Sequence, residues 1–150
     1  MQKFLSTLER FAPVVLRLGM TAVILWFSLQ QFFHAGAWTA YVPDSAVAFS
    51  HLSATTLVYL NATFELVFGV MLAFGYYTRI VALLLALHLF DIMVVVGYGE
   101  IGVRDFGLAL ATLVVCMNGP DELSFHQKER PVPVQPVMPT QPPRMPRRMI

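Results

Sequence analysis

Four long apolar stretches alternate with short polar segments along the chain. They cover about residues 14–33, 57–77, 80–96 and 101–117. A helix needs about 20 residues to cross the hydrocarbon core of a bilayer, and each stretch meets or approaches that length. The strict apolar–polar alternation of a membrane β-barrel strand is absent from the sequence. The pattern therefore predicts an all-α integral membrane protein, built as a bundle of four transmembrane helices.

The segments that flank these stretches differ in character. Apolar residues recur at helical spacing within residues 4–11, which predicts a short N-terminal interfacial helix leading into the first span. The long connection at residues 34–56 carries Trp and Tyr, which favour lipid headgroups, so we expect it to lie along the membrane surface. The last part of the chain is rich in proline and arginine, which predicts a disordered C-terminal tail. We therefore expect a membrane domain at residues 1–126 and a tail at residues 127–150.

Composition supports this division and excludes several classes of site. Hydrophobic residues make up 57% of the chain and charged residues 13%, whereas soluble domains carry about 25% charged residues. The single cysteine, Cys116, excludes an intramolecular disulfide, a CxxC redox pair and a thiolate metal cluster. We expect membrane lipids around the protein, no nucleic-acid partner and no metal site.

The distribution of positive charge predicts the orientation. If the N-terminus is inside, eight Lys and Arg residues fall on the cytoplasmic side and only Arg104 on the opposite side. This predicts a multi-pass protein of the inner (plasma) membrane with both termini in the cytoplasm. Arg17 lies within the first span, and we expect it to extend to the cytoplasmic headgroups as a snorkelling anchor. The eight residues are Lys3, Arg10, Arg79, Lys128, Arg130, Arg144, Arg147 and Arg148.

Polar residues inside the spans are the candidate functional residues. An Arg, Lys or Asp near the centre of a membrane helix costs about 2.5 to 3.5 kcal/mol. With a rise of about 1.5 Å per residue, Glu65 and His88 both lie about 12 Å below the outer surface. Side chains three or four residues apart share a helix face, so we expect one polar, ligand-binding pocket in the outer half of the bundle. Its candidate residues are Asn61, Glu65, His88, Asp91, Arg104 and Asp105.

Two interpretations of this cluster stay open. A carboxyl group among apolar helices can exchange protons with a bound quinone or thiol-derived substrate. Alternatively, Arg104 pairs with Glu65 or Asp105 and only locks the helices together. We assign no catalytic residue from the sequence.

Six short motifs, in order along the four spans, point to a family. They are Leu16-Arg17-Leu18-Gly19, Tyr41-Val42-Pro43, Phe64-Glu65-Leu66-Val67-Phe68-Gly69, Gly75-Tyr76-Tyr77-Thr78-Arg79, Gly102-Val103-Arg104-Asp105 and Asn118-Gly119-Pro120-Asp121-Glu122-Leu123-Ser124. On these motifs, which span about residues 12–126, the chain resembles the DoxX family of small four-helix bacterial and archaeal membrane proteins. The last motif departs from the family pattern, because Asp121 replaces its second glycine.

The resemblance implies fold more than activity. The broader superfamily includes the small subunit of thiosulfate:quinone oxidoreductase, helper proteins for quinoprotein maturation and a cargo receptor. The resemblance implies an accessory subunit of a membrane redox system linked to quinones or thiols. Such a subunit would have protein partners and quinone as its candidate cofactor, with no redox centre encoded in the chain. The alternative is a non-enzymatic scaffold or cargo-binding protein whose polar cluster is structural. A transporter is disfavoured by the lack of inverted repeats. Catalytic activity and oligomeric state stay open.

Overall fold

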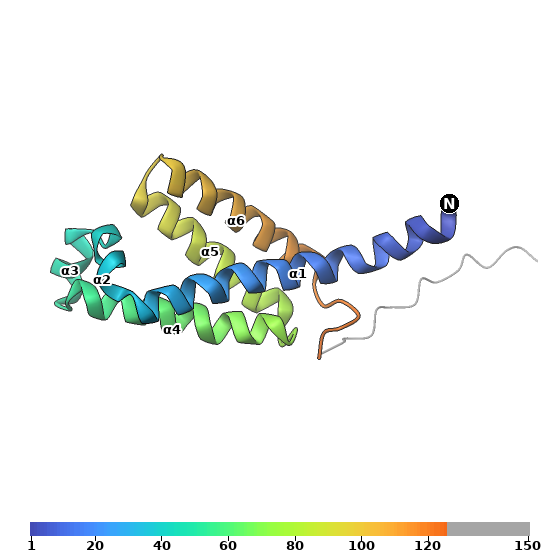
Figure 1. Cartoon of the computed structure of the whole chain (residues 1–150), viewed down its shortest axis with the longest axis horizontal. Coiled ribbons are helices and arrows are strands. Elements are labelled where there is room, and N and C mark those ends of the chain that lie inside the picture. The colour runs from blue at the N-terminus through green and yellow to red at the C-terminus, as the bar shows by residue number, and fades with distance from the viewer. Residues whose placement is uncertain (126–150) are drawn as a thin grey trace, which may run out of the picture.

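A computed structural model of the chain describes residues 1–125, which are helical over most of their length and contain no strand (Figure 1). The all-α prediction is therefore confirmed for this part, and the predicted tail at 127–150 lies outside the described residues. The long helices are α1 (Gln2–Phe33), α4 (Ala54–Ala73), α5 (Thr78–Val96) and α6 (Glu100–Asn118). Short helical turns, α2 (Ala35–Trp38), η1 (Thr39–Tyr41) and α3 (Asp44–Ser50), connect α1 to α4.

Within residues 1–125, three helices are long and apolar enough to cross a membrane: Phe4–Phe33 within α1, Ala54–Ala73 and Thr78–Val96. The second and third agree with the predicted spans to within four residues, and the first contains the predicted span but begins ten residues earlier, at Phe4. The chain is therefore a membrane protein. The fourth predicted span corresponds to α6, which carries Arg104 and Asp105 near its start. That α6 also crosses the membrane stays a prediction.

Helix α1 is one unbroken helix of 32 residues, about 48 Å long at 1.5 Å per residue. The sequence predicted a separate interfacial helix before the first span, but the structure joins the two segments, although Pro13 lies inside the helix. Proline removes one backbone hydrogen bond without necessarily ending a helix, and membrane helices tolerate it. The first turns of α1 therefore extend beyond the other helices (Figure 1).

The long helices form two pairs, α1 with α4 and α5 with α6. The pairs meet at the end where α4 turns into α5, and they separate toward the end that carries α2 and α3 (Figure 1). We call these the turn end and the cavity end. A short turn joins α4 to α5, but α4 packs mainly on α1. The buried core between the pairs comprises Met20, Ile24, Leu72, Val81, Ala82, Leu85, Leu89, Ala109 and Val115.

The turn end is held by a buried ion pair. Arg17 is only 1% exposed; its Nε donates to Oδ2 of Asp121 at 2.7 Å and its Nη2 to Oδ1 at 3.0 Å. Nη1 donates to the carbonyl oxygens of Leu72 and Ala73, which lie at the end of α4. The predicted snorkelling role of Arg17 is therefore wrong, because its guanidinium has a carboxylate and two carbonyls inside the protein.

The segment after α6 folds back onto the α4–α5 turn. Phe125 N–H donates to the carbonyl of Phe74 at 2.9 Å. Gly75 has φ +67°, and a Cβ there would lie 2.5 Å from Ser124 Oγ, so only glycine fits at this contact. This exit segment, which follows α6, therefore contacts both α1 and the α4–α5 turn.

Acid should weaken this end of the molecule. Burial alone would raise the pKa of Asp121, but the hydrogen bonds and charge of Arg17 outweigh it and hold the pKa below its ordinary value of 3.8. The folded state therefore binds this proton more weakly than the unfolded state, so stability is fully present above the ordinary value and is lost as pH falls below it. We expect thermal melts in detergent to show a loss of stability below about pH 4.

Asp121→Asn is the variant that tests this, since it removes the titrating group. We expect its melting temperature to change less with pH below about pH 4 than that of the wild type. Asp44→Asn, on the exposed side of α3, is the matched control and should keep the wild-type profile. Equal acid dependence in the wild type and Asp121→Asn would contradict the assignment.

Candidate functional site

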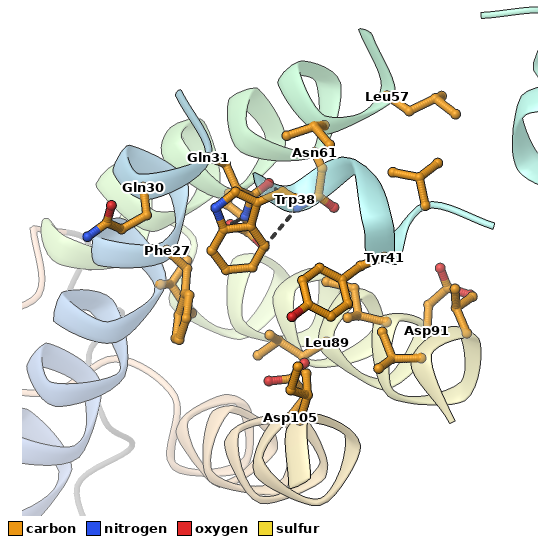
Figure 2. Close-up of a pocket in the computed structure, with 18 of the residues that line it drawn as sticks. Phe27, Gln30, Gln31, Trp38, Tyr41, Leu57, Asn61, Leu89, Asp91 and Asp105 are labelled. Carbon is orange, nitrogen blue, oxygen red and sulfur yellow. Dashed lines mark hydrogen bonds between the residues drawn. The ribbon is translucent and has the colours of Figure 1, made fainter. Parts of the chain in front are cut away.

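A cavity of about 990 Å³ lies at the cavity end, where the two helix pairs separate. Its walls come from all four long helices, and α2 and η1 contribute Trp38 and Tyr41. The connection predicted to lie along the membrane surface therefore also forms part of the cavity wall. Figure 2 shows the rings of Trp38 and Tyr41 projecting between the wall that carries Asn61 and the wall that carries Asp105.

Glu65 lies on α4 and is 3% exposed. Its Oε2 accepts a hydrogen bond from Nε2 of Gln31 at 2.8 Å, and its Oε1 accepts one from Nδ2 of Asn61 at 3.1 Å. The same Asn61 nitrogen also donates to Oε1 of Gln31 at 2.8 Å. The three side chains thus form a closed ring of hydrogen bonds between α1 and α4. Glu65 is the acceptor in both of its hydrogen bonds, which is the only role open to a carboxylate.

His88 lies beside Glu65 but not on the cavity wall. Its Nε2 is 3.5 Å from Oε1 of Glu65 and makes no hydrogen bond within residues 1–125. The imidazole packs against Phe64, with ring centroids 4.6 Å apart. His88 therefore contacts the Glu65 carboxylate from α5, outside the ring formed with Gln31 and Asn61.

The opposite wall carries a second polar pair, on α6. Nε of Arg104 donates to Oδ1 of Asp105 at 2.8 Å, and the guanidinium carbon lies 4.5 Å from the centroid of Phe27. The Asp105 side chain is 5% exposed and that of Arg104 is 40% exposed. Of the two partners predicted for Arg104, the structure shows Asp105.

The structure brings five of the six predicted residues to the wall of one cavity: Asn61, Glu65, Asp91, Arg104 and Asp105. Asp91 is exposed at this wall. His88, the sixth, is placed behind Glu65 as described. A shared location is thus established, whereas ligand binding by these residues stays a prediction.

Sequence reasoning missed several residues of this site. Phe27, Gln30, Gln31, Trp38 and Tyr41 all line the cavity. A signal for Gln31 was present, because Arg17, Thr21, Ser28 and Gln31 recur at helical spacing and all four are buried on one face of α1. A buried amide in a membrane helix needs a partner, and this holds for Gln31 as it does for the predicted Asn61.

The cavity wall combines aromatic rings with a few polar groups. Ligand cavities are typically apolar and aromatic, with a few polar groups that converge on the ligand. Among residues 1–125, no three His, Cys, Asp or Glu side chains come together in a way that could hold a metal ion. The chemistry available from the cavity walls is therefore hydrogen bonding, aromatic contact and proton exchange with carboxyl groups.

Comparison with known proteins gives one finding. The family model described as DoxX matches residues 12–98, which is more than half of the chain. The match includes α1 from Ala12 onward, the connection through α2 and α3, and both α4 and α5. No curated protein and no solved structure matches the chain.

Proposed function

The chain belongs to the DoxX family, and we propose that it is an accessory subunit of a membrane redox system that binds a quinone headgroup in the cavity. In this proposal it is a four-span bundle of the inner (plasma) membrane, with α6 as the fourth span. Both termini are cytoplasmic, as the distribution of Lys and Arg favours. The cavity end then faces outward.

The observation that carries the proposal is the composition of the cavity wall. Aromatic rings from Phe27, Trp38 and Tyr41 surround a space into which polar groups on α4 and α6 project (Figure 2). A quinone headgroup is a flat ring with oxygens at opposite ends, so it can pack against aromatic rings and reach two polar walls. A molecule with an apolar tail can also enter from the bilayer between the separated helix pairs.

In this proposal the chain binds the quinone and exchanges protons with it, and a partner protein supplies the electrons. Glu65 and His88 provide adjacent groups that can hold a proton next to the cavity. The Nη groups of Arg104 can donate to an oxygen of the ligand, since only Nε is used by Asp105.

One observation favours a second candidate function. Both oxygens of Glu65 already accept hydrogen bonds from Gln31 and Asn61, as expected for a carboxylate that only joins two helices. In that case the protein is a non-enzymatic scaffold or cargo-binding protein, and its polar cluster is structural.

Glu65→Gln should remove bound quinone from the purified protein. The new amide places a donor where Gln31 or Asn61 already donates, so the hydrogen-bonded ring must rearrange. We expect quinone that copurifies with the protein, measured by extraction and mass spectrometry, to fall about tenfold or more. Arg104→Gln should act in the same direction. Glu9→Gln, an exposed change near the N-terminus of α1, is the matched control.

The two functions predict different outcomes for these variants. If Glu65→Gln keeps wild-type quinone content but melts at a lower temperature, the cluster is structural and the scaffold function is favoured. If the wild-type protein carries no quinone and binds none when it is added, the proposed redox role is wrong.

A further inference from the structure

The hydrogen bonds of Asn61 leave one atom unused at the cavity wall. Its Nδ2 donates to both Gln31 and Glu65, so both of its hydrogens are engaged and the orientation of the amide is fixed. The carbonyl oxygen Oδ1 has no hydrogen-bond partner among residues 1–125. Because Asn61 lines the cavity, the α4 wall presents a fixed acceptor to a ligand.

The α6 wall presents a second acceptor. Asp105 is 4% exposed, and its Oδ1 accepts from Nε of Arg104. Its Oδ2 has no partner within the described part of the chain, and Asp105 lines the cavity. Among the described residues, the buried side-chain atoms without a partner are Thr21 Oγ1 and His88 Nε2. Oδ2 of Asp105 is therefore accessible, so water or a ligand can donate to it. Figure 2 shows Asn61 on the α4 wall and Asp105 on the opposite, α6 wall.

The charged groups on the cavity wall also favour a ligand that donates hydrogen bonds. Among the described residues that line the cavity are three with carboxyl groups, Glu65, Asp91 and Asp105, and one Arg or Lys, Arg104. An acid-rich cavity favours a ligand that donates hydrogen bonds and disfavours one that carries only acceptor oxygens.

We propose that the cavity prefers the reduced form of its ligand, a 1,4-dihydroxy aromatic ring, over the oxidised quinone. One hydroxyl donates to Oδ1 of Asn61 and the opposite hydroxyl to Oδ2 of Asp105. A quinone has only carbonyl oxygens and would face both acceptors without a proton between them. Either form can accept from Arg104, so the difference arises at Asn61 and Asp105. This inference rests on the proposed quinone-binding function and specifies which redox form the site holds.

The test measures both forms on the full-length protein in detergent under anaerobic conditions. Equilibrium dialysis with a decyl-substituted 1,4-benzoquinone and with its chemically reduced hydroquinone gives the two dissociation constants. We expect the hydroquinone to bind about tenfold tighter or more, as a hydrogen bond to a charged acceptor allows. Asp105→Asn should reduce this ratio toward one, because the new amide can present a donor to a carbonyl oxygen. Asn61→Leu should also reduce it, by removing the other acceptor.

Each outcome bears on a defined claim. Asp44→Asn, an exposed change of the same type, should keep the wild-type ratio. Equal affinity of the wild-type protein for both forms, or tighter binding of the quinone, would overturn the preference and leave the proposed function standing. Binding of neither form would overturn both. If Asp105→Asn fails to fold, the ratio of Asn61→Leu decides, and an unchanged ratio there would contradict the inference.

Discussion

Replacing Arg17 by methionine is expected to lower the free energy of unfolding by about 3 to 5 kcal/mol, since removal of one partner leaves a buried charge uncompensated. Asp121 would remain 3% exposed with no cation beside it. The carbonyl oxygen of Ala73 would also lose the donor that Arg17 provides, whereas that of Leu72 would keep the N–H of Gly75. In an apolar setting an unpaired carbonyl is costly. Denaturant titration in detergent, followed by circular dichroism, measures the change.

The neighbouring ion pair gives a matched control. Arg10 pairs with Glu122, but its side chain is 62% exposed, and exposed pairs contribute little. Arg10→Met should therefore leave the unfolding transition nearly unchanged. The double variant Arg17→Met with Asp121→Leu should recover part of the loss, because it removes both charges. If Arg17→Met loses no more stability than Arg10→Met, the buried pair does not hold the turn end.

The sequence predicts the helices well because the membrane imposes a simple requirement on them. Backbone groups in lipid must be satisfied within the segment, so a long apolar stretch can only be a helix there. The same reasoning predicts where polar side chains gather. Glu65 and Asp105 are costly in lipid, and the structure buries both in the protein at one cavity.

The remaining features depend on contacts between distant parts of the chain. Hydropathy gives the depth of Arg17, but its partner Asp121 lies 104 positions away in a segment that follows the last helix. Lipid-facing snorkelling and a buried ion pair fit the same sequence position, and only the fold distinguishes them. Likewise, aromatic residues such as Trp38 favour membrane interfaces by type, so their place at the cavity depends on how α2 and η1 fold over it.

Gly102→Ala is expected to disturb the site through the backbone. A Cβ at residue 102 would lie 2.0 Å from the carbonyl oxygen of Gly97, which ends α5. That atom belongs to the backbone, so the first turn of α6 must move away from α5. We expect a loss of about 1 to 3 kcal/mol in unfolding free energy, typical of overpacking. Arg104 and Asp105 follow within three residues, so their side chains should shift at the cavity wall. We therefore expect the folded variant itself to bind quinone more weakly, in addition to being less stable.

Gly107→Ala separates this steric effect from the general effect of alanine in a helix. Gly107 lies on the same helix, and a Cβ there would meet nothing within 4 Å. Alanine favours helix by about 1 kcal/mol over glycine, so this variant should be as stable as the wild type or more so, with unchanged quinone binding. Equal melting temperatures and equal quinone binding for Gly102→Ala and Gly107→Ala would show that α6 does not need the close approach at Gly97. In that case, the close approach of Gly102 to Gly97 would not be what places Asp105 on the cavity wall.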